Sequence, residues 1–226
     1  EVKRWMPDET VSVVNTGKQD IEDTNIVIIN YDLVGKQSEA LQSLWAKIMV
    51  IDEVHYLKNK KAKRTEATIV GNFEVVNYAQ KEGCPNAHPM HIGGGNTFPF
   101  GHLKLTIAHH GSSMPDGSYG GNPAGLLLTI DGKKIYHAGD TGLTYDMKLL
   151  EKEQVDLAIL PIGDNFTMGP DDALEAVKFV NPKLVIPVHY NTWPLIEQDP
   201  QAWGPRVEEA TSAKVKVLTP GESFEL

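Results

Sequence analysis

The sequence of 226 residues predicts an α/β fold. Short apolar runs bounded by Gly, Pro, Asn and Asp recur along the chain and are typical of buried strands. Segments with helical start and stop signals separate some of these runs. Hydrophobic residues make up 41% of the chain and charged residues 23%, which is enough apolar matter for a core and excludes a disordered or collagen-like protein.

The first third of the chain alternates predicted strands and helices. Strands are expected over residues 11–14 and 26–31, a helix over 38–45, and a buried strand over 47–51. A basic stretch, residues 58–64, follows them. We interpret it as a solvated helix face rather than a nucleic-acid contact, because the net charge of -9 argues against a surface built to bind phosphates.

Strands dominate after that stretch. They are predicted over residues 68–70, 103–108, 126–130, 134–137, 157–161, 184–188 and 215–218. The clearest helix spans residues 171–180, since Pro170 stands where helices begin, acidic residues fill the first turn and Asn181 with Pro182 ends it.

The composition also divides the chain near residue 67. Residues 1–67 carry 10 basic and 11 acidic side chains (10 - 11 = -1), whereas residues 68–226 carry 11 and 19 (11 - 19 = -8). Seven of the eight histidines lie in the second part. We therefore predict two parts, residues 1–67 and 68–226.

The same inventory bounds the setting of the protein. A single cysteine, Cys84, excludes an intramolecular disulfide, and no apolar run reaches the roughly 20 residues of a membrane span. The first residues lack the basic and apolar pattern of a secretory signal. We expect a cytoplasmic protein that acts on a small-molecule substrate without nucleic acid or membrane, and the sequence leaves a homo-oligomer open.

Three predicted strands end directly in residues that bind metals. They deliver His109 and His110, His137 and Asp140, and His189. Imidazole and carboxylate are zinc ligands when thiolates are scarce. For one histidine alone a structural role is the better interpretation, but three such strand ends favour a metal site. A Ser112–His110 pair, which would indicate a serine hydrolase, explains the pattern less well.

Several motifs together resemble bacterial and archaeal metal-dependent hydrolases of the metallo-β-lactamase superfamily, in the branch related to L-ascorbate-6-phosphate lactonase. The resemblance covers about residues 66–226. It rests on HPMHIGGG at residues 88–95, HGS at 110–112, GNPAG at 121–125, IYHAGDT at 135–141, LPIGDNFTMGP at 160–170 and VHYNT at 188–192.

The resemblance implies an αββα sandwich with a site for one or two divalent metals, of which zinc is the expected ion. Its implied metal ligands are His110, Asp140 as the bridging carboxylate, and His189. Asp140 and His137 are the implied catalytic residues. The substrate pocket is implied to include His91, Asp164 and Asn165. In that family a metal-held hydroxide attacks an ester, lactone or phosphodiester.

The N-terminal part departs from this family, because it lacks the principal signature of the family, His-x-His-x-Asp-His. Residues 26–33 and 45–59 instead resemble motif II of Swi/Snf-type helicase-like ATPases, where Asp52 would hold Mg²⁺ and Glu53 would orient water. The N-terminal half of the sandwich is thus expected to be replaced or atypical. Asp52, Glu53 and His55 are candidate additional ligands for the metal or for Mg²⁺.

Three functions follow as alternatives. The first is a metal-dependent hydrolase, impaired by the missing motif, and the second is a non-catalytic fusion or chimera with residual metal binding. The third, a nucleic-acid-dependent ATPase fragment, is disfavoured because residues 15–19 lack the first glycine and the hydroxyl of a phosphate-binding loop.

Overall fold

The computed structural model describes residues 11–14, 26–29, 68–84, 86–219, 222 and 226. The chain divides into two compact units. The first comprises residues 1–89, 113–121 and 219–225, and the second comprises residues 90–112 and 122–218 with residue 226. The predicted helix 38–45, the predicted strand 47–51 and the candidates Asp52, Glu53 and His55 lie outside the described residues.

Within its described residues, the first unit has two small sheets and one helix. Strands β1 (Val11–Val14) and β2 (Ile26–Ile29) pair in parallel, and β3 (Ile69–Asn72) pairs with β4 (Ala87–Met90). Helix α3 (Phe73–Lys81) begins where the Asn72 side chain accepts a hydrogen bond from the Val75 N–H at 2.8 Å. The Asn72 amide also donates to the Gly120 carbonyl at 2.9 Å, which ties the residue 113–121 segment to this helix start.

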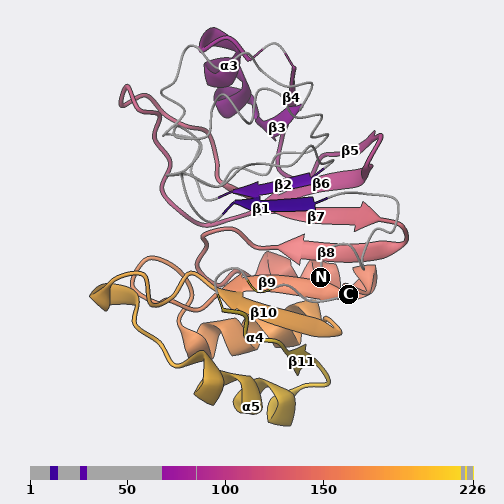
Figure 1. Ribbon diagram of the computed structural model, residues 1–226, viewed down its shortest axis with the longest axis vertical. Coiled ribbons are helices and arrows are strands. Elements are labelled where there is room, and N and C mark those ends of the chain that lie inside the picture. The colour runs from indigo at the N-terminus through magenta and orange to yellow at the C-terminus, as the bar shows by residue number, and fades with distance from the viewer. Residues whose placement is uncertain (1–10, 15–25, 30–67, 85, 220–221, 223–225) are drawn as a thin grey trace. The chain divides into compact units, whose positions relative to one another are not determined.

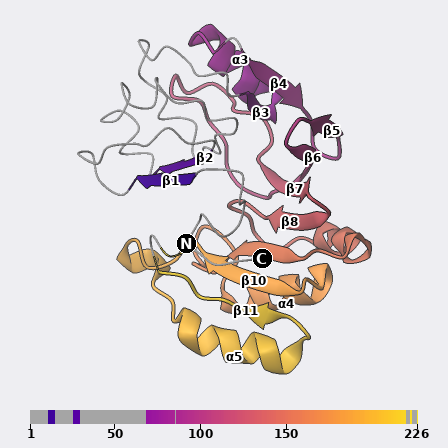
Figure 2. The same cartoon turned by 45° about the vertical axis from the view of Figure 1, so that its right-hand side comes forward.

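The second unit is built on a seven-stranded sheet in the order β11-β10-β9-β8-β7-β6-β5 (Figures 1 and 2). Its strands are β5 (Gly95–Phe98), β6 (Gly101–Ile107), β7 (Ala124–Ile130), β8 (Lys133–His137), β9 (Leu157–Pro161), β10 (Leu184–Val188) and β11 (Lys214–Val215). Neighbours are antiparallel from β5 to β8 and parallel from β8 to β11.

A two-residue turn, Asp131-Gly132, joins β7 to β8. Both residues have positive φ angles, 48° and 77°, which is the conformation that Asp-Gly favours in tight hairpins. The turn pairs Ile130 with Lys133, and the same register places His137 opposite Leu126 at the far end of β8.

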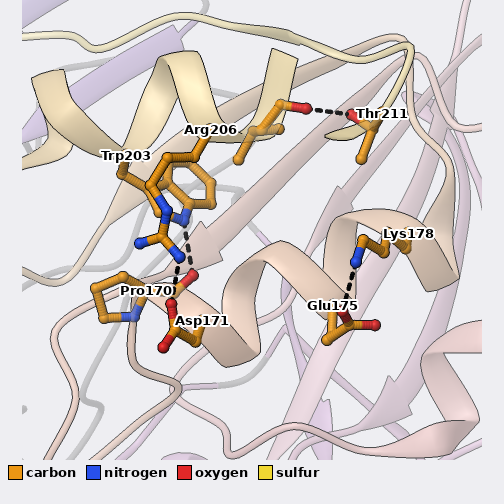
Figure 3. Close-up of polar contacts among 8 residues, drawn as sticks. Pro170, Asp171, Glu175, Lys178, Trp203, Arg206 and Thr211 are labelled. Carbon is orange, nitrogen blue, oxygen red and sulfur yellow. Dashed lines mark hydrogen bonds and ion pairs between the residues drawn. The ribbon is translucent and has the colours of Figure 1, made fainter. Parts of the chain in front are cut away.

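Helical segments η3 (Tyr145–Glu153), α4 (Pro170–Val180) and α5 (Pro200–Ala210) contribute with the sheet to one hydrophobic core. Short η4 (Pro194–Ile196) precedes α5. Trp203 is 1% exposed, and its indole N–H donates to the Pro170 carbonyl at 2.8 Å, while Arg206 pairs with Asp171 (Figure 3). These contacts fix α5 against the start of α4.

The α/β class is confirmed. Strands 157–161 and 184–188 and the helix over 171–180 are found at or within one residue of their predicted bounds. The prediction of a strand over 215–218 is wrong beyond Val215, because β11 ends there. None of the helices in the described ranges has the length and apolar character needed to cross a membrane.

Candidate active site

The strand directions bring four loops to one edge of the seven-stranded sheet. Strands β6 and β8 are both antiparallel to β7 and therefore run the same way, and β9 and β10 are parallel to β8. The carboxyl ends of all four strands thus meet at one edge, where ligands bind in many α/β proteins. We call this the carboxyl edge; its loops are residues 108–112, 138–144, 162–169 and 189–199.

Asp140 and His189 face each other at the carboxyl edge. Asp140 Oδ2 lies 3.4 Å from His189 Nε2, and their side chains are 24% and 20% exposed. The other ring nitrogen, His189 Nδ1, is buried and has no hydrogen-bond partner among the described residues. The ring therefore presents Nε2 to the carboxylate and to solvent.

The backbone at His189 requires glycine at position 163. A Cβ atom on Gly163 would lie 2.1 Å from the His189 carbonyl oxygen and 3.1 Å from His189 Nδ1. Gln198 links the two loops at this point. Its side-chain amide donates to the Gly163 carbonyl at 3.2 Å, and its backbone N–H donates to Asn191 Oδ1 at 2.7 Å. His189 and Asn191 both have left-handed φ angles, 56° and 59°. Such backbone strain at a strand end is typical of functional loops.

Hydrogen bonds place the ring proton on different nitrogens in His110 and His137. His110 is exposed, and its Nδ1 lies 3.0 Å from the Gly111 carbonyl, so Nδ1 carries the proton and Nε2 has a lone pair. In His137, Nδ1 accepts a hydrogen bond from the Gly139 N–H at 3.0 Å, so the proton of the neutral ring lies on Nε2. His110 is therefore suited to bind a metal through Nε2, and the neutral His137 ring is suited to donate a hydrogen bond through Nε2.

Thr141 holds two of the loops together. It is fully buried, and its hydroxyl accepts from the His109 N–H at 2.8 Å and donates to the Gly142 carbonyl at 2.7 Å. Gly142 N–H donates in turn to the His109 carbonyl at 3.1 Å, and Met168 N–H to the Thr141 carbonyl at 2.9 Å. Sequence reasoning did not assign this role to Thr141; the only signal was a small hydroxyl residue directly after Asp140.

The predicted pocket residues occupy loops of the same unit. Asp164 and Asn165 are exposed and left-handed, with φ angles of 62° and 53°, and Asp164 Oδ1 accepts from the Asn165 N–H at 2.8 Å. His91 is exposed in the segment before β5, where its carbonyl accepts from the Gly94 N–H.

The assignment of Asp140, His189 and His110 as metal ligands stays a prediction. Asp140 and His189 come together, but in the part of the chain that the structure describes no group of three or more His, Cys, Asp or Glu is placed to hold an ion. A carboxylate and an imidazole are donors that Zn²⁺ and similar divalent ions accept. The chemistry of the pair is therefore compatible with one side of a metal site.

Comparisons with known proteins identify the family of the chain. Residues 52–190 match the family model of the beta-lactamase superfamily domain. The UPF0173 metal-dependent hydrolase of Pelotomaculum thermopropionicum is 55% identical over 170 residues, which cover 73% of this chain and 74% of that protein. The corresponding protein of Desulforamulus reducens is 54% identical over 170 residues, with the same coverage.

A solved structure is similar as well. A metallo hydrolase from the hyperthermophilic archaeon Ignicoccus hospitalis superposes with a TM-score of 0.68 and 33% identity, over 82% of each chain. Residues 1–76 separately match the family model of the SNF2-related domain, a match confined to the N-terminal third.

Proposed function

Because the chain belongs to the beta-lactamase superfamily, among the relatives of the UPF0173 metal-dependent hydrolases, we propose that it cleaves an ester, lactone or phosphodiester bond at the carboxyl edge. It is a metal-dependent hydrolase of metallo-β-lactamase type, and its fold is the α/β sandwich that the sequence predicted. The observation that carries the choice of site is the 3.4 Å approach of Asp140 to His189 at the ends of β8 and β10.

In the proposed site Asp140 and His189 hold a divalent ion, with His110 Nε2 as a further donor. The donor types favour zinc. When bound, such an ion lowers the pKa of a water molecule and polarises the bond to be cleaved. Thr141 keeps the His109–His110 loop beside Asp140, and Gly163 with Gln198 keeps the His189 ring aimed at the carboxylate.

His137 is the proposed hydrogen-bond donor to the leaving oxygen. Its Nδ1 accepts from the Gly139 N–H, so the proton of the neutral ring lies on Nε2. Asp164, Asn165 and His91 are proposed to lie along the substrate, since all three are exposed.

The N-terminal part enters as two further proposals. The family match begins at residue 52, so Asp52, Glu53 and His55 lie within it and are proposed as additional metal donors in place of the missing motif. Residues 1–67 are proposed to derive from a Swi/Snf-type lobe without ATPase activity, supported by the match over residues 1–76. A non-catalytic chimera that binds metal is the competing proposal.

Metal content and hydrolysis, measured together, test these proposals. The full chain would be analysed for bound metals and assayed with 4-nitrophenyl acetate, γ-butyrolactone and bis(4-nitrophenyl) phosphate. Asp140→Ala and His189→Ala should each lower turnover by about 10³-fold, the scale reported for removing one electrostatic group from an active site. His102→Ala is the matched control, because His102 is an exposed histidine near the start of β6.

The outcomes separate the proposals. Activity retained in Asp140→Ala would refute the assigned site. Bound metal without turnover in the unaltered chain would favour the chimera. A metal content unchanged by His55→Ala would remove His55 from the ligands.

A further inference from the structure

Two exposed aromatic rings stand beside the Asp140–His189 pair. Phe166 is 50% exposed in the loop after β9, and Trp193 is 44% exposed in the loop after β10. Their ring centroids lie 6.1 Å apart, and the Trp193 ring meets the His189 ring edge-to-face at the same distance. Trp193 thus contacts a residue of the proposed metal site directly.

Backbone hydrogen bonds position the loops that carry these rings, although the rings themselves are exposed. Ile196 N–H donates to the Trp193 carbonyl at 3.2 Å, and Asn191 N–H donates to the Ile196 carbonyl at 2.9 Å. Ile196 is itself fully buried, as is Met168, which follows Phe166 in the other loop. Buried neighbours therefore anchor both loops while the two large apolar rings face outward.

The charge of the carboxyl edge narrows what these rings can bind. Its four loops contain the acidic residues Asp140, Asp164, Glu197 and Asp199 and no Lys or Arg. Recognition of a phosphate or carboxylate away from the metal normally uses Arg, Lys or a cluster of backbone N–H groups. Away from the proposed ion, Asp164, Glu197 and Asp199 repel such a substrate and tolerate an uncharged one.

We propose that Phe166 and Trp193 form a subsite for the aryl group of an uncharged carboxylic ester or lactone. This inference rests on the proposed hydrolase function, and it names the substrate class of that same site. The substrate's flat apolar group stacks on the two rings, while its carbonyl faces Asp140 and His189. Aromatic pairs of this kind prefer offset or edge-to-face contact and contribute beyond their buried area.

Binding to the full chain as purified tests the subsite without relying on turnover. The dissociation constants of phenylacetamide, acetamide and 4-sulfophenylacetamide would be measured by NMR titration. Phenylacetamide should bind about tenfold more tightly than acetamide, which corresponds to the energy of an aromatic pair. The Phe166→Ala/Trp193→Ala variant should remove this difference, and Trp193→Phe should keep most of it.

Leu195→Ala is the matched control, because Leu195 is 63% exposed in the same loop and contributes no ring. It should leave the preference for phenylacetamide unchanged. Tighter binding of 4-sulfophenylacetamide than of phenylacetamide would overturn the uncharged substrate class.

Hydrolysis of methyl phenylacetate and methyl acetate forms the second arm. Methyl phenylacetate should have about tenfold higher kcat/KM than methyl acetate, because its KM is lower. The double variant should lose this advantage. Cleavage of both esters at equal efficiency, without ring-dependent binding, would overturn the subsite and leave the proposed function standing. Ring-dependent binding without cleavage of either ester would support the subsite and contradict the proposed ester hydrolysis.

Discussion

The two edges of the seven-stranded sheet use polar residues in opposite ways. At the edge where β8, β9 and β10 begin, which we call the amino edge, the nearly buried Asp156 accepts from the Lys134 N–H and from Lys183 Nζ, both at 2.8 Å. Lys134 Nζ in turn pairs with Glu153 at 2.7 Å. At the carboxyl edge His189 has a buried nitrogen without a partner in the described part of the chain and a left-handed backbone.

The titration behaviour follows this difference. Burial alone would raise the pKa of the Asp156 carboxyl, but hydrogen bonds from Lys183 and the Lys134 N–H, with the charge of Lys183, hold that pKa below its ordinary value. The hydrogen bond from Lys134 likewise lowers the pKa of Glu153. At the carboxyl edge burial raises the pKa of the Tyr190 hydroxyl. The same strands therefore begin among charge pairs at the amino edge and lead to left-handed backbone at His189 and Asn191 at the carboxyl edge.

The largest expected effect comes from adding one methyl group at the carboxyl edge. Gly163→Ala would force its Cβ against the His189 carbonyl oxygen. We expect the free energy of unfolding to fall by about 3 kcal/mol, the cost of overpacking, and metal binding to weaken. Urea denaturation checks the first result. Gly142→Ala, where the added Cβ meets nothing within 4 Å, is the control and should change little.

At the amino edge, Asp156→Asn should cost about 2 kcal/mol of stability, because it weakens two charge-assisted hydrogen bonds of a buried carboxylate. Turnover per folded molecule should stay the same, since Asp156 lies at the edge opposite the site. Denaturation and steady-state rates measured on the same preparation check both. A large loss of kcat with unchanged stability would reverse the roles of the two edges.

The stabilisation that the Asp156 carboxylate provides should be lost at low pH. The pKa of Asp156 is lower in the folded chain than in the unfolded chain, so its stabilisation is complete above the unfolded value of about 4 and is lost as the pH falls through the folded value. The difference in unfolding free energy between the wild type and Asp156→Asn should narrow below about pH 4. Denaturation curves at pH 7, 5, 4 and 3 test this, and a constant difference at all four would contradict it.

A substitution at Thr141 should have a smaller effect, on both stability and metal affinity. Thr141→Val removes the hydroxyl between the His109 N–H and the Gly142 carbonyl, so we expect a loss of about 1.5 kcal/mol of stability. Metal affinity should also fall about tenfold, as for other residues that orient ligands. Thr141→Ser keeps the hydroxyl and should restore both. Equal behaviour of the two variants would show that the hydroxyl does not orient the site.

The smallest effect is expected away from both edges. Lys178 and Glu175 form an exposed ion pair on α4, with Nζ and Oε1 2.6 Å apart (Figure 3). Lys178→Gln should change the free energy of unfolding by less than about 0.5 kcal/mol, because exposed pairs are screened by water. The same denaturation assay provides this baseline, and a change above 1 kcal/mol would mean that charge pairs stabilise the chain wherever they lie.

The sequence predicted those strands whose apolar runs are continuous. Residues 157–161 and 184–188 lie in the parallel part of the sheet, where strands are covered on both faces and read as apolar throughout. β5, with the sequence Gly-Asn-Thr-Phe, has no such run and was missed. Helix α5 was missed because Gly204 and Pro205 count against a helix, whereas the Asp199 cap and buried Trp203 favour it.

The site followed the same rule. The closeness of Asp140 and His189 could be predicted because each lies in the loop that follows a strand that the sequence predicted. Thr141 could not, because its function depends on a hydrogen bond to residue 109, and local sequence carries no record of such a contact. Burial, which local sequence does not record, divides the large apolar residues of this region: Phe166 and Trp193 are exposed, whereas Met168 and Trp203 belong to the core.

The Asp131-Gly132 turn has a consequence for the way this chain can change in evolution. Surface turns usually accept insertions, but this one sets the pairing of β8. One added residue taken up into β8 would turn Tyr136 out of the core and move Asp140 relative to His189. The length of this exposed turn at the amino edge therefore determines the position of Asp140 at the opposite edge. We expect that length to be among the least variable features of the chain.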